Sequence, residues 1–244
     1  MPSQSTLFVF SDLDDTLFQT ERKCPSQGIH RPAAVDRQGQ TLSYFTAEQG
    51  VLLTLIEQGT VIPVTGRNTA ALERVHMSFN SYRITSHGAL ITGADGNPDE
   101  EWLIMLQAQQ AIWAERMEYA LKVIARTIER NEWALRCRII EDQGWPVYVS
   151  VKGDERDLAS LRTTALALWC ENGARIHSNG QNMALLPAFA DKERAVRFLM
   201  RRIRDTGIEP LFLGLGDSVT DMPFLRLCHY AITPRGSQIH ASWT

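Results

Sequence analysis

The amino-acid sequence predicts an α/β fold, in which a Rossmann-type parallel sheet is interrupted by an inserted α+β domain. Short apolar runs without two-residue alternation recur along the chain, with helical patterns between them. Such runs are typical of strands buried on both faces of a parallel sheet. Between residues 90 and 186 the pattern changes to a long amphipathic helix, two strands, a second helix and two more strands. We therefore expect a core of residues 1–89 and 187–244 and an inserted domain of residues 90–186.

The expected core strands are residues 7–10, 61–64, 83–85 and 211–215. A helix over residues 47–58 begins after Thr46, a plausible N-cap, and ends at Gly59. A second helix follows Arg67, and a third covers residues 191–205. Ligands of open α/β sheets bind at the carboxyl ends of the strands. Polar residues follow at least three of these strands, so we expect the functional site there.

The inserted domain is expected to have the order αββαββ. Its first helix covers residues 106–130, and its second begins after Asp154 and carries apolar residues at helical spacing. The candidate strands are residues 136–140, 147–152, 174–177 and 183–186. Their polar residues are candidate substrate contacts or solvated positions: Arg136, Arg138, Lys152, His177 and Asn182.

Charge and composition favour a small-molecule partner. The formal net charge of the 244 residues is −3, which gives no electrostatic indication of binding to nucleic acid or to an anionic membrane. No apolar stretch approaches the length of a membrane span, and the N-terminus lacks the features of a signal peptide. We expect a cytoplasmic protein, monomeric or homodimeric. The four scattered cysteines indicate neither disulfides nor a zinc site.

Acidic residues follow two of the expected strands. Asp12, Asp14 and Asp15 follow the first strand, and Asp217 and Asp221 follow the last. Three carboxylates within one turn of backbone repel one another unless a cation neutralises them, and oxygen ligands suit Mg²⁺. A surface turn would explain the first group alone, but not both groups together.

Two further motifs suit an anionic ligand. The Thr65-Gly66-Arg67 tripeptide ends a strand and offers a hydroxyl, backbone N–H groups and a guanidinium, although Thr65 as a simple cap is the alternative. Lys192 lies in the first turn of its helix, where the helix dipole disfavours a cation. Beside a phosphate and a carboxylate it would reduce their repulsion. An exposed lysine balanced by its acidic neighbours is the other interpretation.

The ordered set of DLDDT, TGR, a late helical Lys and GDSVTD resembles the haloacid dehalogenase superfamily of phosphatases. The insert resembles the large cap of the type IIB subfamily, which includes sucrose-phosphate and mannosyl-3-phosphoglycerate phosphatases. The resemblance implies a magnesium-dependent phosphatase acting on a small phosphorylated metabolite, with the cap setting substrate specificity.

The resemblance also implies a role for each matched residue. Asp12 would be the nucleophile and a metal ligand. Asp14 would be the general acid and base and would ligate Mg²⁺ through its backbone carbonyl. Thr65, with Gly66 and Arg67, would bind the phosphoryl group. Lys192 would bridge the nucleophile and the phosphate. Asp217 would complete the metal shell, with Asp221 beside it.

Three departures from the family pattern affect the surroundings of these residues. Asp15 replaces a usual Gly, Thr220 replaces a frequent Asn, and Ser-His-Gly-Ala at 86–89 replaces Asn-Gly-Ala. His87 is a candidate substrate contact, but a packed hinge histidine is the favoured interpretation.

Two other functions fit the same motifs. A phosphotransferase or phosphomutase would use the same chemistry with a sugar as acceptor, and a catalytically silent binding module would keep only the fold. Haloalkanoate dehalogenation is disfavoured. Enzymes of that kind need no Mg²⁺, whereas this sequence keeps the second carboxylate, Asp14, and the acidic pair Asp217 and Asp221.

The segment 18–44 is expected to be a long irregular loop beside the phosphoryl site. Arg22 or Lys23 in this segment is a candidate for recognising a second anionic group of the substrate. A solvated surface charge is the alternative for both residues.

Overall fold

The computed structural model describes residues 6–28 and 30–242 and confirms the α/β fold. The chain divides into two compact units, here called the core unit (Met1–Asp99 and Lys192–Thr244) and the inserted unit (Glu100–Asp191). The sequence placed the boundaries after residues 89 and 186. The first boundary lies later in the structure because β7 (Leu90–Thr92) pairs with β6 (Arg83–Thr85) of the core unit.

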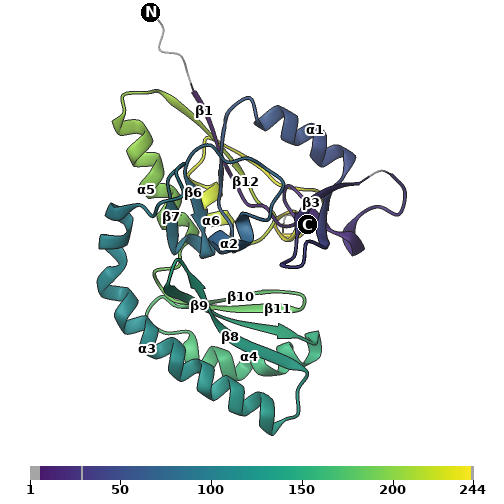
Figure 1. Cartoon of the computed structure of the whole chain (residues 1–244), viewed down its shortest axis with the longest axis vertical. Coiled ribbons are helices and arrows are strands. Elements are labelled where there is room, and N and C mark those ends of the chain that lie inside the picture. Colours follow the sequence, from purple (N-terminus) through teal and green to yellow (C-terminus); the bar gives the residue numbers. More distant parts are fainter. Residues whose placement is uncertain (1–5, 29, 243–244) are drawn as a thin grey trace, which may run out of the picture. The chain divides into compact units, whose positions relative to one another are not determined.

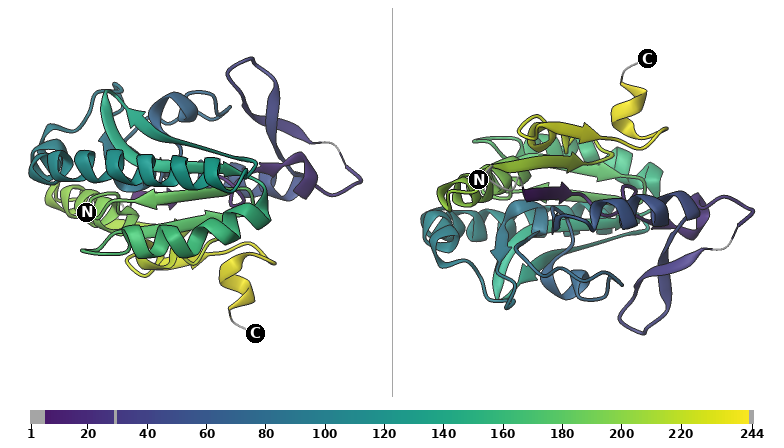
Figure 2. Two further views of the ribbon diagram at one scale, coloured as in Figure 1. Left: turned by 90° about the horizontal axis from the view of Figure 1, so that it is seen from below. Right: turned by 90° about the horizontal axis from the view of Figure 1, so that it is seen from above.

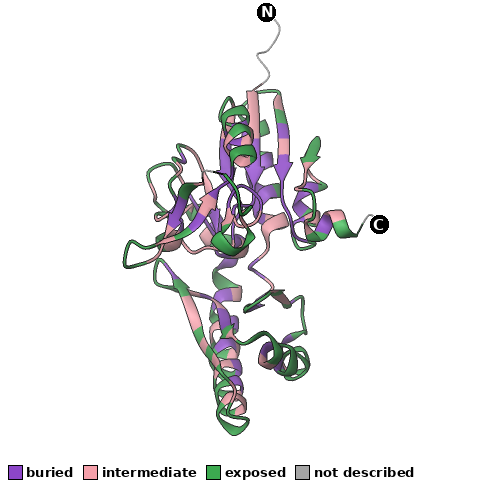
Figure 3. Ribbon diagram, turned by 90° about the vertical axis from the view of Figure 1, so that its right-hand side faces the viewer, coloured by how far each residue is buried: buried purple, intermediate pink, exposed green. Residues whose placement is uncertain are grey.

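A four-stranded parallel sheet forms the centre of the core unit (Figure 1). The strand order is β13 (Tyr230–Ile232), β12 (Pro210–Leu215), β1 (Thr6–Ser11) and β5 (Thr60–Pro63). Burial along β1 increases from Thr6 toward Ser11, as Figure 3 shows below the N-terminus. The buried ends of β1 and β12 therefore carry the loops with the acidic residues.

Each face of this sheet has its own apolar packing. Val9 and Leu215 lie in one cluster with Leu53 and Ile56 of α1 (Ala47–Ile56). Successive strand side chains point to opposite faces, so Phe10 lies on the other face, where its ring is 5.8 Å from that of Phe212. Helix α5 (Lys192–Asp205) buries an apolar stripe that includes Val196 and Leu199.

Helix α1 begins as the sequence predicted. The Thr46 side chain accepts a hydrogen bond from the Gln49 N–H, and the Gln49 side chain accepts one from the Thr46 N–H. This reciprocal capping box satisfies two N–H groups that the helix leaves unpaired. The helix expected after Arg67 is only the short α2 (Thr69–Leu72), and α6 (Met222–Leu225) and α7 (Gln238–Ala241) are equally short.

Two expectations for the core unit need correction. Residues 18–44 are not an irregular loop, because β2 (Gln19–Thr20), β3 (Arg31–Val35) and β4 (Thr41–Phe45) form an antiparallel sheet, with a 3₁₀ turn (Glu21–Lys23) directly after β2. Strand β6 is not a full member of the parallel sheet. It meets the residue after β5 through one parallel bridge, between Val64 and Ile84.

The inserted unit has the expected αββαββ order. Its elements are α3 (Glu100–Arg130), β8 (Leu135–Asp142), β9 (Trp145–Gly153), α4 (Glu155–Trp169), β10 (Arg175–Asn179) and β11 (Asn182–Leu186). The strands form an antiparallel sheet in the order β10-β11-β9-β8. Figure 1 and the left view of Figure 2 show α3 and α4 on the same face of this sheet.

The opposite face of this sheet is polar. The register aligns Arg138, Ser150, Ala184 and His177 across the four strands. The next row on the same face contains Arg136, Lys152, Asn182 and Asn179. The polar residues that the sequence singled out therefore share one side of the sheet. Among the described helices, none is long and apolar enough to cross a membrane.

Candidate active site

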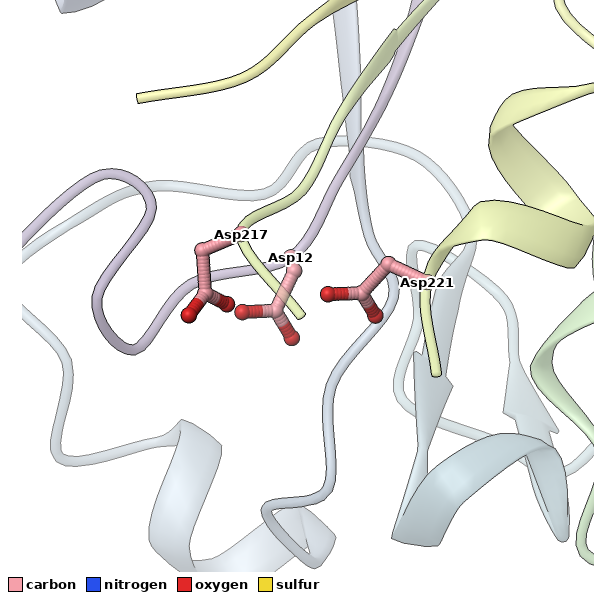
Figure 4. A group of neighbouring side chains, drawn as sticks. All are labelled: Asp12, Asp217 and Asp221. Carbon is pink, nitrogen blue, oxygen red and sulfur yellow. The ribbon is translucent and has the colours of Figure 1, made fainter. Parts of the chain in front are cut away.

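Three carboxylates converge at the carboxyl ends of β1 and β12. Asp12 directly follows β1, Asp217 lies in the loop after β12, and Asp221 immediately precedes α6. One carboxylate oxygen of each lies within 4.8 Å of the others, and Figure 4 shows the three side chains pointing toward one another. Two chain segments some 200 residues apart therefore build one acidic cluster, because β1 and β12 are neighbours in the sheet.

Lys192 neutralises part of this cluster. Its Nζ donates to an oxygen of Asp12 and to an oxygen of Asp221, each at 2.7 Å. As the first residue of α5, it reaches the cluster from the helix N-terminus. Burial alone would lower the pKa of Lys192, but the two carboxylates raise it. The lysine therefore remains an ammonium at neutral pH.

The cluster still carries excess negative charge. Burial raises the pKa of Asp12, and Asp221 and Asp217 add to this effect while Lys192 opposes it. Burial and the charge of Asp221 likewise raise the pKa of Asp217 to about 6. Three carboxylates against one ammonium leave two negative charges, which one divalent cation would balance.

The three aspartates are not equivalent as metal ligands. Both oxygens of Asp221 are engaged, one by Lys192 and the other by the N–H and hydroxyl of Ser218. The hydroxyl of Thr16 lies 3.3 Å from Asp12 Oδ2 and 3.5 Å from Asp217 Oδ1. The donor set thus fits a hard divalent cation held by Asp12 and Asp217, while Asp221 positions Lys192.

Asp14 is paired with Arg67 in this structure. Arg67 Nε and Nη2 donate to the two oxygens of Asp14, both at 2.7 Å. The guanidinium also lies 5.3 Å from the centre of the Phe18 ring. Burial alone would lower the pKa of Arg67, but Asp14 raises it. The guanidinium that the sequence offered to a phosphate is here bound to the expected acid–base residue.

Thr65 and Gly66 lie at the end of the neighbouring strand. Val64 N–H donates to the carbonyl of Ser11, so the buried Thr65 follows on the strand beside Asp12. The Thr65 hydroxyl accepts a hydrogen bond from the Arg67 N–H at 3.1 Å. A Cβ atom on Gly66 would lie 2.5 Å from the ring of His87, so any side chain at this position would force that ring to move.

The three departures from the family pattern are structurally accommodated. Asp15 adopts a φ of 65°, a left-handed conformation that favours glycine, and its carboxylate binds Lys23 at 2.6 Å. Thr220 approaches the Ser218 hydroxyl at 2.8 Å. The His87 N–H donates to the carbonyl of Thr65, and its ring packs against Gly66. Lys23 thus has an acidic partner, whereas Arg22 is exposed.

Three residues of this region received no role from the sequence. Thr16 lies between Asp12 and Asp217, and Ser218 fixes Asp221. Gly216 contributes through its lack of a side chain, since a Cβ there would lie 2.7 Å from that of Asp221. Their positions within DLDDT and GDSVTD were visible in the sequence, but hydroxyl contacts of this kind depend on side-chain rotamers.

No protein-family model matches the chain, and no curated protein matches its sequence. Solved structures do match its fold. A Thermoplasma acidophilum protein has a TM-score of 0.56 at 16% identity, covering 96% of this chain and 87% of that chain. The C-terminal domain of C. albicans trehalose-6-phosphate phosphatase has a TM-score of 0.55 at 17% identity, covering 92% and 74%. Sucrose-phosphatase from Synechocystis, solved with sucrose and phosphate, has a TM-score of 0.54 at 17% identity, covering 98% and 96%. These likenesses confirm the expected fold, a parallel α/β core with an inserted α+β domain.

Proposed function

We propose that this chain, whose fold is shared with sucrose-phosphatase, is a magnesium-dependent phosphatase of small phosphorylated metabolites. The observation that carries the proposal is the contact of Lys192 Nζ with Asp12 at 2.7 Å inside the acidic cluster. A carboxylate beside an ammonium and a divalent cation can approach a phosphate dianion, which would otherwise repel it.

In the first step, an Asp12 oxygen attacks phosphorus and the ester P–O bond breaks, which leaves an aspartyl-phosphate. Asp14 protonates the departing oxygen. In the second step, water attacks the aspartyl-phosphate, Asp14 takes the water proton, and inorganic phosphate leaves with the Asp12 carboxylate restored. Two in-line displacements replace one very slow hydrolysis.

The other residues stabilise charge. Lys192 balances the nucleophile and the phosphoryl oxygens, and Thr65 donates its hydroxyl to the phosphoryl group. Mg²⁺ held by Asp12, Asp217 and the backbone carbonyl of Asp14 would supply electrostatic stabilisation of the transferring group. Asp221 keeps Lys192 in place through its 2.7 Å contact.

Arg67 is assigned here as the residue that positions Asp14, in place of the direct phosphate contact expected from the sequence. A protonated carboxyl group cannot keep two charge-assisted bonds to a guanidinium. We therefore expect Asp14 to lie away from Arg67 while it carries a proton, and to bind Arg67 again whenever it is ionised.

We further propose that the inserted unit acts as the cap and selects the substrate through the polar face of its sheet. Arg136, Arg138 and Lys152 place three cations on this face, with His177 and Asn182 beside them. Such a face suits a polyhydroxylated substrate with an acidic group beyond the phosphate, so sugar phosphates and phosphoglycerate conjugates are the favoured classes.

The test is a screen of phosphate release with Mg²⁺ and with EDTA. It compares trehalose 6-phosphate, sucrose 6-phosphate, mannosyl-3-phosphoglycerate, nucleotides and para-nitrophenyl phosphate. We expect release that requires Mg²⁺ and is fastest for one sugar phosphate or phosphoglycerate conjugate. An absence of phosphate release from every compound, or release that persists in EDTA, would contradict the proposal.

A further inference from the structure

Asp217 is the least constrained of the three carboxylates in the acidic cluster. Lys192 Nζ binds both Asp12 and Asp221 at 2.7 Å. Within the part of the chain that the structure describes, the side chain of Asp217 makes one hydrogen bond, from the hydroxyl of Thr16 at 3.5 Å. A hydrogen bond of this length is at the upper limit for such contacts. The position of the Asp217 carboxylate therefore depends mainly on the backbone that carries it.

Two residues of α7 hold the loop that carries Asp217. The Ile239 N–H donates to the carbonyl of Asp217 at 3.0 Å. The side-chain oxygen of Gln238 accepts a hydrogen bond from the N–H of Val219, two residues further along the loop, at 3.4 Å. Helix α7 lies outside the DLDDT, TGR and GDSVTD motifs. The loop is thus held at Asp217 and just beyond it by a segment that none of these motifs includes.

Helix α7 is fixed in its turn by a cap and by burial. The hydroxyl of Ser237 accepts a hydrogen bond from the His240 N–H at 3.1 Å and lies 2.8 Å from the hydroxyl of Thr233. The side chain of Ile239 is only 3% exposed. A helix of four residues is not stable by itself, because forming the first turn is unfavourable. The cap and the buried Ile239 side chain therefore keep the Ile239 N–H directed at the Asp217 carbonyl.

A Mg²⁺ ion at the candidate site would be sensitive to the position of Asp217. Mg²⁺ demands near-octahedral geometry, with oxygen ligands at about 2.0–2.1 Å. The other expected side-chain ligand, Asp12, is fixed independently, since its N–H donates to the carbonyl of Leu215 at 2.9 Å and its carboxylate binds Lys192. Loss of the α7 contacts should therefore displace Asp217 relative to Asp12 and weaken metal binding.

We propose that α7 positions the metal ligand Asp217, with Ile239 as the main contact and Gln238 as the second. Both residues act through the backbone of the loop, so they are positioning residues and not catalytic ones. The inference rests on the proposed function in one respect, because the metal concerned is the Mg²⁺ of that proposal. It extends the site to two residues that the sequence motifs did not indicate.

The test measures the dissociation constant for Mg²⁺ by isothermal titration calorimetry, on the full chain without substrate and after removal of metal with EDTA. Ile239→Ala should raise this constant about tenfold, the lower end of the loss seen when residues that orient metal ligands are replaced. Gln238→Ala should raise it about threefold, as expected for one lost hydrogen bond. Ile239→Val keeps a branched apolar side chain in the buried position and should bind Mg²⁺ nearly as the wild type does.

A general loss of stability would give a different pattern, which matched controls reveal. Ile56→Ala makes the same change at an isoleucine that is 1% exposed at the end of α1, and Gln107→Ala truncates an exposed glutamine of α3. Thermal unfolding in EDTA should show a comparable loss of stability for Ile239→Ala and Ile56→Ala. The dissociation constant for Mg²⁺ should change in the α7 variants and stay at the wild-type value in both controls.

Three results would overturn the inference: no change of the dissociation constant in the α7 variants, an equal rise in Ile56→Ala, or a wild-type chain that binds no Mg²⁺. Gln238 is exposed, so Gln238→Ala tests the role even if Ile239→Ala does not fold. A chain that shows the expected Mg²⁺ binding but releases no phosphate from any compound of the screen would contradict the proposed function and still support the positioning role of α7.

Discussion

Asp12 is the residue on which the proposed chemistry depends most directly. We predict that Asp12→Asn lowers phosphate release at least about 1,000-fold, because an amide cannot attack phosphorus and form the ester intermediate. The fold should persist, since the amide can still accept from Lys192. The control is Asp205→Asn on the exposed end of α5. Wild-type-like turnover of folded Asp12→Asn protein would refute the assignment of the nucleophile.

The bidentate contact between Asp14 and Arg67 leads to a prediction about coupling. If Arg67 acts only through Asp14, the double variant Asp14→Asn/Arg67→Gln should be no slower than Asp14→Asn alone. Each single variant should slow substrates with poor leaving groups more than para-nitrophenyl phosphate, which needs little protonation. Steady-state kinetics of the four proteins measures this coupling.

The alternative role of Arg67 predicts a different result in the same experiment. Direct binding of the phosphoryl group would make the two substitutions additive, and Arg67→Gln would raise KM for all substrates equally. Additive losses would therefore return Arg67 to the phosphate contact that the sequence suggested.

Some features of the candidate site could be predicted from the sequence, and others could not. The order of DLDDT, TGR, Lys192 and GDSVTD was sufficient to expect the acidic cluster, because strand ends in a parallel sheet meet at one edge. The pairing of Arg67 with Asp14 was not predictable, since it depends on the rotamer of a long side chain. The ion pair of Lys23 with Asp15, eight residues earlier in the chain, was not predictable for the same reason.

At the scale of elements, long helices and strands with a clear apolar pattern were predictable from periodicity, whereas short or irregular strands were not. Helix α3 and the four strands of the inserted unit follow clear apolar patterns. Strands β2, β3 and β4 were missed because β2 has two residues and β3 contains Pro32 at its second position, so neither gives a clean alternation. Tertiary pairing with β4 fixes them instead.

The polar face of the inserted sheet gives a prediction at this scale. Arg138→Gln should raise KM for the preferred natural substrate by about tenfold, the size expected for one lost charge-assisted contact, and should leave kcat nearly unchanged. Arg162→Gln on exposed α4 is the matched control. An unchanged KM for Arg138→Gln, measured on the best substrate of the screen, would show that Arg138 on this sheet face is exposed to solvent and does not bind the substrate.

At the scale of the whole molecule, we expect the acidic cluster to make the free energy of unfolding depend on pH and on Mg²⁺. The pKa of Asp217 is raised from its ordinary value of 3.8 to about 6. Between these values the folded protein binds more protons than the unfolded chain, so in EDTA its free energy of unfolding should fall as the pH rises through this window. Asp12, whose pKa is also raised, contributes with the same sign.

If Mg²⁺ occupies the proposed site, it should reverse this loss of stability, because it would compete with protons for the ionised carboxylates. We predict that Mg²⁺ raises Tm more at about pH 7.5 than at about pH 5. Scanning calorimetry in EDTA and in Mg²⁺ at both pH values measures the effect. Asp217→Asn should remove most of the metal-dependent shift. A Tm gain that is equal at the two pH values would argue against a metal held by these carboxylates.

Ion pairs hold the chain on both sides of the boundary at which it passes from the inserted unit to the core unit. Asp191, the last residue of the inserted unit, is held by Arg175 at 2.9 Å, and the next residue, Lys192, is held by Asp12 and Asp221. One added or deleted residue at this joint would pull one of the two anchors from its partner. Length variation among relatives, or exchange of the inserted unit by protein engineering, must therefore be absorbed elsewhere. The turns at Gly144 and Gly180 are suitable, because the segments on either side of them are paired strands of the same sheet.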